Sequence, residues 1–437
     1  MHFLLATWDG AGTVPVDFGI ARRLVARGHT VTVLGDPTVE AEAARSGTEF
    51  VSWREAPHRR STALEDDVLK DWEVVNNPVK LFRRLMQRLV TGPATLFAKE
   101  TVEELQRRPA DVVVVDAAIL GPVVATESLR VPTVAVCPGT YVLPANGMPP
   151  FGLGLKPARG APGRARDRAL NAVVKAAWRS GLPALNDART AYGLAPLTDP
   201  WDQLRSCDSM LVATARAFDF PAVTPHWAHY IGPVTDDPVW AATPSSVDEL
   251  LPGDDAALPL VVVGVSGSFV RGQDDLLRRV AVALDSLPVR ALVCTGPYVD
   301  PEEVPGSERV RVVRAAPHSE VFPRADVVVT HGGHGTIIKA LALGKPVLCL
   351  PGIRDQKDNA VRMTERGAGL ALRPATRPSG IAAAVKRLLE EPRFAVAAAE
   401  LGARIRSEVD DDRLVDLLER PARPREPAPG PFPAPGG

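Results

Sequence analysis

Two successive series of short apolar runs constrain most strongly how this chain can fold. The first series lies at residues 2–7, 31–34, 112–116 and 133–137, and the second at residues 260–264, 290–294, 325–330 and 345–350. Runs that are apolar on both faces are typical of parallel strands in a sheet that helices cover on both sides. Helical patterns, such as the one over residues 16–28, lie between these runs. The sequence therefore predicts an α/β fold of two Rossmann-like domains that face a central cleft.

The domain boundaries follow from length and composition. A chain of 437 residues is too long for one hydrophobic core. Residues 233–258 contain four prolines, one glycine and several acidic residues, which predicts an interdomain linker. We expect an N-terminal domain over residues 1–232 and a C-terminal domain over residues 259–420. Residues 421–437 are almost entirely Pro, Ala, Gly and charged residues, so they are predicted to form a disordered tail.

Charge and cysteine content exclude several classes of protein. The formal net charge is -1, so nucleic acid is not expected as a partner. No apolar stretch reaches the ~20 residues that span a bilayer, and the N-terminus lacks the pattern of a signal peptide. The four cysteines lie far apart without metal-ligand spacing: Cys137, Cys207, Cys294 and Cys349. We therefore expect a cytoplasmic protein without a membrane span, with reduced thiols in its core.

A glycine-rich segment follows the run at residues 325–330. Residues His331 to Thr336 read His-Gly-Gly-His-Gly-Thr and lead into a helical pattern. Glycines let backbone N–H groups approach an anion, and the N-terminus of a helix adds unpaired donors and partial positive charge. The segment is therefore a candidate diphosphate site, although a purely structural turn with a threonine cap has the same pattern.

Polar residues follow the next predicted strand. Asp355 and Gln356 come directly after the run at residues 345–350, and Asn359 follows them. Because successive parallel strands end at the same edge of a sheet, these side chains are expected to face the same cleft as the diphosphate site. A carboxylate beside an amide can both accept and donate hydrogen bonds, which suits sugar hydroxyls. A solvated loop is the alternative.

The stretch from Val327 to Leu372 resembles the donor-binding signature of family 1, UDP-glycosyltransferase-like enzymes of the GT-B fold. It is most similar to the actinobacterial branch that decorates macrolides and other secondary metabolites. The resemblance extends more weakly over residues 1–410. It implies that the N-terminal domain binds the acceptor and the C-terminal domain binds an NDP-sugar.

The resemblance also implies a role for individual donor-site residues. It places His331, Gly335 and Thr336 at the diphosphate, Asp355 and Gln356 at the sugar hydroxyls, Ser266, Gly267 and Ser268 near the phosphates, and Ala316 and His318 at the nucleobase. Gly333 and Asn359 are further candidates for donor binding.

The chain departs from this family where the catalytic base is expected. Many relatives have Gly-His-Val-Asn-Pro after the first strand, whereas this chain has Thr13 at the position of the histidine. A threonine hydroxyl is no general base near neutral pH. Asp9, in the turn after the first run, and Asp116, at the end of the third, are the candidate bases, because a carboxylate in an apolar cleft can have a raised pKa. Each has a structural alternative as a capping residue, and Asp17 is interpreted as a favourable charge at a helix N-terminus.

A second departure concerns the nucleotide. Many relatives have a glutamate that binds the ribose hydroxyls of UDP where this chain has Lys339. An ammonium group cannot accept those hydrogen bonds. The substitution weakens the case for UDP and leaves room for a dTDP-sugar, whereas a lysine that points to solvent would have no bearing on the nucleotide.

We predict an inverting glycosyltransferase that moves a sugar from a UDP- or dTDP-sugar to a hydroxyl of a hydrophobic small molecule. Neither a metal nor another cofactor is expected. A sugar-nucleotide epimerase or hydrolase on the same fold, and a non-catalytic binding or activator protein, remain as alternatives. A homodimer is also left open. The expected acceptor cleft is apolar and aromatic, with candidate lining residues Trp8, Trp53, Trp72, Phe82, Phe97, Tyr141, Met148 and Phe151.

Overall fold

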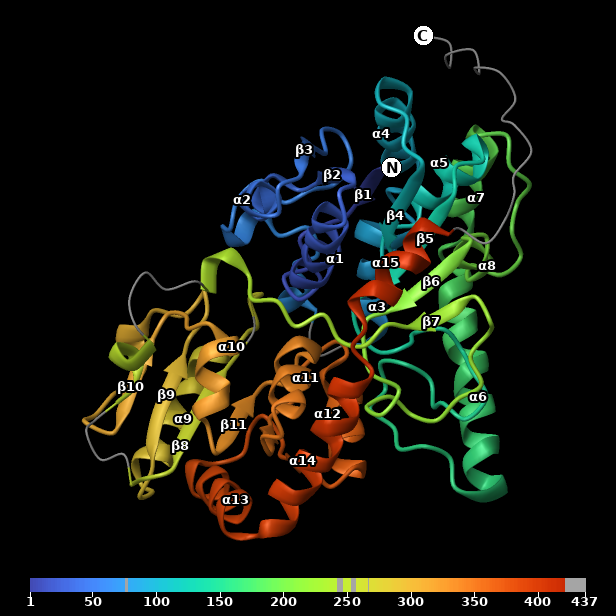
Figure 1. Ribbon diagram of the computed structural model, residues 1–437. Helices are drawn as coiled ribbons and strands as arrows, with labels where there is room; N and C mark the ends of the chain where they lie inside the picture. Colours follow the sequence, from blue (N-terminus) through green and yellow to red (C-terminus); the bar gives the residue numbers. More distant parts are fainter. Residues whose placement is uncertain (75–77, 242–246, 253–256, 266, 421–437) are drawn as a thin grey trace.

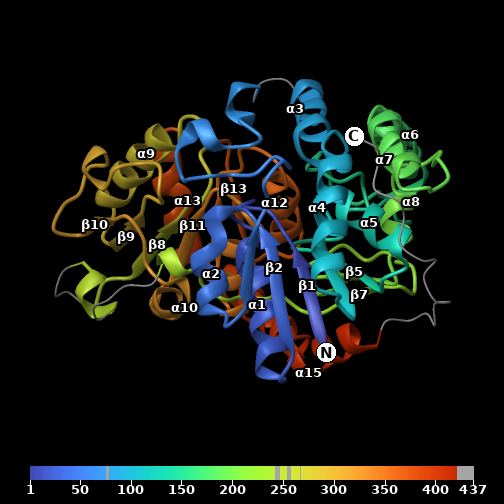
Figure 2. The same cartoon turned by 90° about the horizontal axis from the view of Figure 1, so that it is seen from above.

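The structure is a computed structural model that describes residues 1–74, 78–241, 247–252, 257–265 and 267–420. The described chain forms two lobes, each built on one parallel sheet with helices on both faces (Figure 1). Viewed from above, the first lobe lies partly over the second (Figure 2). The predicted α/β fold with two facing Rossmann-like units is confirmed.

The first sheet has seven strands in the order β3-β2-β1-β4-β5-β6-β7, all parallel. Its strands are β1 (His2–Ala6), β2 (Thr30–Gly35), β3 (Glu49–Ser52), β4 (Val112–Asp116), β5 (Thr133–Cys137), β6 (Ser209–Val212) and β7 (Ala228–Tyr230). The helices of this part of the chain are α1 (Val14–Ala26), α2 (Glu40–Arg45), α3 (Pro78–Leu85), α4 (Ala94–Arg107), α5 (Gly121–Leu129), α6 (Gly160–Arg179), α7 (Leu182–Ala191) and α8 (Asp202–Arg205).

The second sheet has six strands in the order β10-β9-β8-β11-β12-β13, again all parallel. Its strands are β8 (Leu260–Gly264), β9 (Arg290–Cys294), β10 (Val310–Val313), β11 (Val327–Thr330), β12 (Val347–Cys349) and β13 (Gly369–Ala371). The helices that follow β8 are α9 (Gln273–Asp285), α10 (His318–Val321), α11 (His334–Ala342), α12 (Gln356–Glu365), α13 (Pro378–Glu390), α14 (Pro392–Ser407) and α15 (Asp411–Glu419).

The central strands are buried on both faces, which is why their sequences do not alternate. All five residues of β4 are buried, and so are all five of β8. β-branched valines fill these strands and suit a pleated surface packed on both sides. The four cysteines are free and buried, as expected of core thiols.

Each sheet reverses its strand order at one point. In the first sheet the chain runs outward from β1 to β3 and then returns to place β4 on the other side of β1. In the second sheet the same reversal lies between β8 and β11. Ligands of open α/β sheets bind at such points, beyond the carboxyl ends of the strands. The topology therefore predicts that a ligand binds beside the residues that follow β1, β4, β8 and β11.

The last helix changes the expected division of the chain. Residues up to 420 were predicted to belong to the C-terminal domain, but α15 packs beside α1 on the first sheet (Figure 1). Leu414, Val415 and Leu418 are buried in the same cluster as residues of β1 and β2. An apolar face on α15 accounts for this return, because it removes those three side chains from water. The predicted tail, residues 421–437, lies outside the described residues.

In the described part of the chain, no helix combines the length and the apolar character that crossing a membrane requires.

Candidate functional site

The glycine-rich turn after β11 is shaped by close packing. Gly332 has φ of +101°, and a Cβ atom there would lie 2.8 Å from Sγ of Cys349. A Cβ on Gly333 would lie 2.9 Å from Nε2 of His331. Gly335, in the first turn of α11, is exposed, and no atom beyond its chain neighbours and the backbone of its own helix lies within 4 Å of its Cβ position. The first two glycines thus let the turn close, and Gly335 leaves the N-terminus of α11 open to a ligand.

Three predicted donor-site residues converge on Gly264, the last residue of β8. Nε2 of His318 lies 3.0 Å and Cγ2 of Thr336 lies 3.4 Å from the position that a Cβ of Gly264 would occupy. The ring of His331 interacts with the backbone of Gly264. Burial lowers the pKa of both His318 and His331 to about 4. Both rings are therefore neutral at physiological pH, and each can donate one hydrogen bond.

Asn359 connects the two donor motifs. It is fully buried, and its Nδ2 donates to the carbonyl of Gly332 over 3.0 Å and to Oδ2 of Asp355 over 2.8 Å. Burial raises the pKa of Asp355. Oε1 of Gln356 accepts from two backbone N–H groups of its own loop, Gly352 and Ile353. Asn359 therefore holds Asp355 against the glycine-rich turn. The amide N–H groups of Gln356 are the part of its side chain that remains for a sugar hydroxyl.

The loop after β8 and the segment before α10 complete the predicted donor set. Ser266 lies outside the described residues. A Cβ on Gly267 would lie 3.4 Å from the ring of Trp240 in the predicted linker and 3.5 Å from Ala11 of the other lobe. Ser268 is buried at this boundary, and the side chain of Ala316 lies in the core of the second lobe. Ala316 can therefore meet a ligand only through its backbone.

Two residues of α11 point away from the donor pocket. His334 is buried, and its Nε2 lies 2.9 Å from Oγ1 of Thr214 in the first lobe. Lys339 is buried too, where its ammonium group binds the carboxylate of Asp237 and the carbonyl of Asp236. The interpretation of Lys339 as a residue that points to solvent is therefore wrong, because the linker carboxylate compensates its charge.

At the carboxyl edge of the first sheet, Asp116 ends β4. It is almost fully buried, Oδ1 accepts from the backbone N–H of Ala118 over 2.8 Å, and Oδ2 has no hydrogen-bond partner within the described residues. Burial raises the pKa of Asp116 to about 7, although the nearby indole of Trp8 lowers it. Asp116 is therefore a carboxyl group that can take up a proton near neutral pH.

Asp17, predicted as a favourable charge at a helix N-terminus, lies in the first turn of α1 and is fully buried. Its Oδ2 accepts a hydrogen bond from Oγ1 of Thr7. Burial raises the pKa of Asp17 well above its usual value, and the charge of Asp116 raises it further. The predicted position at the helix N-terminus is therefore confirmed, but burial favours the neutral form of Asp17 over the charged form.

Asp9 is held in a structural network. Its Oδ2 accepts from Oγ1 of Thr38 over 2.8 Å and lies 3.5 Å from Nη1 of Arg59, and its Oδ1 accepts from the backbone N–H of Ala11. This is the pattern of a turn-capping aspartate with a cationic partner. The hydroxyl of Thr13 donates to the carbonyl of Trp8 over 3.2 Å, so it too holds the turn.

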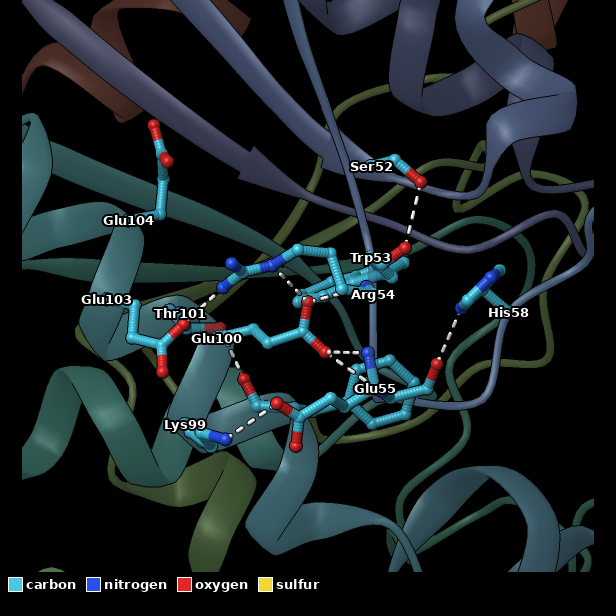
Figure 3. Close-up of polar contacts among 12 residues, drawn as sticks. Ser52, Trp53, Arg54, Glu55, His58, Lys99, Glu100, Thr101, Glu103 and Glu104 are labelled. Atoms are coloured by element: carbon cyan, nitrogen blue, oxygen red, sulfur yellow. Dashed lines mark hydrogen bonds and ion pairs between the residues drawn. The ribbon is translucent and has the colours of Figure 1, made fainter. Parts of the chain in front are cut away.

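The loop after β3 is anchored by Glu100 of α4, which sequence reasoning missed. Its carboxylate accepts backbone N–H groups of Arg54, Glu55 and Ala56 over 2.7, 2.9 and 2.6 Å (Figure 3). A carboxylate with this many backbone donors fixes the course of the loop. The anchored loop carries Arg59 toward the other lobe.

Beyond Arg59, this segment contacts the second lobe. Asp71 binds Nε of Arg354 over 2.7 Å, and Arg59 binds the hydroxyl of Tyr298. The ring of Trp72 packs edge-on against Phe269. A small pocket lies between the lobes there, and its lining includes Trp8, Asp9, Gly10, Arg59, Ser268 and Arg354. Residues that follow β1 and β8 thus border the same pocket.

The predicted aromatic lining of the acceptor cleft is only partly supported. Trp53 and Phe97 are almost fully buried and pack edge-on against each other in the core of the first lobe. The indole N–H of Trp53 donates to the carbonyl of Thr7. These two side chains are therefore core residues, whereas Trp8 borders the pocket. Within the described ranges, no group of three or more His, Cys, Asp or Glu side chains is arranged to hold a metal ion.

A buried ion pair joins the lobes. Arg362 of α12 donates through Nε to Oδ1 of Asp219 over 2.8 Å, and both side chains are buried. Asp219 also accepts from the hydroxyl of Tyr230 and the backbone N–H of Tyr141. The guanidinium of Arg362 lies over the ring of Phe220. This pair fixes α12, which starts at the predicted sugar site, against the first lobe.

Comparison with known proteins agrees with this architecture. Residues 295–419 match the family model of the erythromycin biosynthesis protein CIII-like C-terminal domain. The chain is 27% identical over 424 residues to 4'-demethylrebeccamycin synthase of Lentzea aerocolonigenes, covering 95% of this chain and 98% of the relative. The chain is a glycosyltransferase of the GT-B fold.

Solved structures support the fold of this glycosyltransferase. The glycosyltransferase of kitacinnamycin superposes with a TM-score of 0.73 at 21% identity, covering 96% of this chain and 98% of that one. The glycosyltransferase VinC, solved in complex with dTDP, superposes with a TM-score of 0.67 at 19% identity, covering 96% of this chain and all of that one (100%). The sequence relatives also include the elloramycin glycosyltransferase of Streptomyces olivaceus, which is 42% identical over 100 residues that cover 22% of this chain and 24% of the relative.

Proposed function

We propose that the enzyme transfers a sugar from an NDP-sugar to a hydroxyl of a hydrophobic small molecule, with inversion at the anomeric carbon. The observation that carries this proposal is the shared pocket between the lobes. Ser268, after β8, and Trp8, after β1, both border it. A donor held at the second sheet and an acceptor held at the first would therefore meet where the two reversals of strand order face each other.

On the donor side, the open N-terminus of α11 suits the diphosphate. Backbone N–H groups and neutral His331 can donate to its oxygens, and the helix adds partial positive charge. These donors stabilise the negative charge that develops on the leaving NDP, so we propose that transfer needs no bound metal. Asp355 and the amide group of Gln356 supply an acceptor and a donor for sugar hydroxyls.

On the acceptor side, we propose Asp116 as the general base, in preference to Asp9. Oδ2 of Asp116 is unpaired, whereas Asp9 is held by Arg59, Thr38 and Ala11. Asp116 takes the hydroxyl proton while the acceptor oxygen bonds to the anomeric carbon. The bond from that carbon to the diphosphate oxygen breaks, and its electron pair leaves with the NDP.

Both UDP- and dTDP-sugars remain in the proposal. Lys339 stands where many relatives have the glutamate that binds the ribose hydroxyls, and its ammonium group is paired with Asp237. No carboxylate at position 339 is therefore available to a ribose. This favours a nucleotide whose ribose needs fewer hydrogen bonds, and VinC was solved with dTDP. We propose dTDP-sugars as the first donors to test.

The test is mass spectrometry of the purified enzyme with UDP- and dTDP-sugars and a panel of hydrophobic aglycones. Transfer gives an aglycone that is heavier by one sugar, and the coupling of its anomeric proton in NMR should show inversion. The reaction should proceed in EDTA. Release of NDP without an acceptor would instead indicate a hydrolase, and conversion of the sugar while it stays on the nucleotide an epimerase. Nucleotide binding without turnover would indicate a non-catalytic protein.

A further inference from the structure

Three buried polar atoms without partners lie close together at the end of β1 and β4. They are Nε1 of Trp8, Oδ1 of Asp17 and Oδ2 of Asp116, and none meets the geometry of a hydrogen bond within the described residues. The indole of Trp8 nevertheless approaches Asp116 closely enough to lower the pKa of that carboxyl group. Ala6 of β1 pairs in register with Val115 of β4, so Thr7 and Trp8 follow next to Asp116. Unpaired buried polar atoms are rare in folded proteins and call for an explanation. Of these atoms, Nε1 of Trp8 is a hydrogen-bond donor and Oδ2 of Asp116 is an acceptor.

The position of the Trp8 ring is built into the turn. A Cβ on Gly10 would lie 2.7 Å from Cζ2 of Trp8, so glycine at this position is what lets the ring lie there. Ala11 has a left-handed backbone with φ of +58°, and Thr13 donates to the carbonyl of Trp8. Non-glycine residues adopt such a φ only rarely, so the surrounding contacts must hold the turn in this conformation. The turn therefore fixes the position of Trp8, which borders the pocket and whose indole lies near Asp116.

A hydroxyl group is the chemical partner that satisfies this arrangement. Its O–H donates to a carboxylate while its oxygen accepts from an N–H. We infer that Trp8 is a catalytic residue that binds the acceptor oxygen through Nε1–H and directs its proton to Oδ2 of Asp116. This inference rests on the transfer activity proposed above. The indole also stabilises the negative charge that grows on the oxygen as Asp116 removes the proton.

With Trp8 as a donor and Asp116 as an acceptor, the site should favour oxygen nucleophiles. An alcohol or phenol oxygen has free lone pairs, so it can accept from Trp8 while it donates to Asp116. The N–H of an indole or pyrrole ring can donate to Asp116, but its lone pair belongs to the aromatic system and accepts no hydrogen bond. Trp8 therefore contributes to transfer onto oxygen and contributes little to transfer onto a ring nitrogen.

The experiment compares Trp8→Phe with Trp227→Phe. The first change keeps an aromatic ring and removes the N–H group. Trp227 lies at the amino-terminal end of β7, at the opposite edge of the sheet, so it is the matched control. For hydroxyl acceptors, Trp8→Phe should lower kcat about 10–100-fold, the effect of one hydrogen bond to a developing charge. The KM of the donor and the affinity for dTDP should stay at the wild-type values.

A second variant separates ring position from folding. Gly10→Ala should displace the indole and lower kcat as Trp8→Phe does, because its Cβ overlaps Cζ2. Phenylalanine has no Cζ2, so adding Gly10→Ala to Trp8→Phe should lower kcat little further. A purely structural role of the turn would instead make the two losses multiply.

Wild-type transfer is measured first. If the wild-type enzyme transfers no sugar to any hydroxyl in the panel, the proposed function fails and this inference fails with it. If the wild-type enzyme is active and Trp8→Phe matches Trp227→Phe, only this inference is overturned. An equal loss for hydroxyl and ring-nitrogen acceptors would also overturn it.

Discussion

The two strand-order reversals occupy equivalent points in similar sheets, yet the side chains near them have opposite chemistry. Beyond β11, the turn at His331 offers backbone donors and neutral histidines, and Asn359 ties it to Asp355. Beyond β4, Asp116 and Asp17 are buried carboxyl groups, each with one unpaired oxygen. The first arrangement suits an anion, and the second suits a proton. In the proposed reaction, the first side would stabilise the leaving group and the second would remove the acceptor proton.

The largest expected effect comes from a substitution on the acceptor side alone. Asp116→Asn removes the proposed base while keeping the shape of the side chain. It should lower kcat for hydroxyl acceptors by about 10²- to 10⁴-fold, the usual contribution of a general base. In the wild-type enzyme, kcat/KM should rise with pH through about 7, because only ionised Asp116 accepts a proton. Initial-rate kinetics across pH measures both.

Asp9→Asn is the matched control for that experiment. Asp9 binds Arg59 and Thr38, so its amide variant should affect the stability of the turn more than the chemical step. A greater loss of kcat in Asp9→Asn than in Asp116→Asn would reverse the assignment of the base.

The next effect concerns the ion pair that keeps the two sides facing each other. Arg362→Met leaves the buried carboxylate of Asp219 without its cationic partner. It should reduce the free energy of unfolding by about 3–5 kcal/mol, as breaking buried pairs does. Arg278→Met, which breaks the exposed pair with Asp274, should cost less than about 1 kcal/mol. Urea denaturation measures both, and equal costs would contradict a special role for the buried pair.

The contrast between the two sides also explains what the sequence could predict. The fold class follows from the apolar runs, because burial on both faces leaves a clear pattern. The donor-site candidates lie on short contiguous segments, so His331 to Thr336 could be read directly. On the acceptor side, Trp8 and Asp116 are neighbours only through the register of β1 and β4, and no local pattern encodes that register.

Burial was the quantity that sequence reasoning judged least well. Asp17 has the spacing of a helix N-terminal charge, and only the packing of α1 on the sheet shows that it is desolvated. Trp53 and Phe97 are aromatic residues of the kind that line a cleft, yet they pack against each other in the core. Similarly, the apolar face of α15 did not reveal which of the two lobes it covers.

A smaller effect tests the donor side through its two histidines. His331→Ala removes a donor to the diphosphate and should weaken dTDP binding about 10-fold or more. His334→Ala should leave dTDP affinity unchanged, because that ring binds Thr214 at the interface of the lobes. Since burial holds the pKa of His331 at about 4, its contribution should be constant between pH 7 and 9. Isothermal titration of both variants distinguishes these roles, and equal losses of affinity would contradict them.

The smallest expected effect on catalysis comes from Asp17, which does not touch the substrate. Its raised pKa means that the folded protein binds this proton more tightly than the unfolded chain does. Asp17 therefore stabilises the fold in acid, and that stabilisation is lost as the pH rises through the raised pKa. Asparagine cannot ionise and can still accept from Thr7, so Asp17→Asn should gain stability relative to wild type as the pH rises from about 4 to 8. Melting temperatures across this range measure the gain, and Asp275→Asn, at an exposed carboxylate, should show none. A constant difference across pH would mean that Asp17 is ionised in the folded enzyme, and the acceptor side would then hold two charges rather than one carboxylate and one proton.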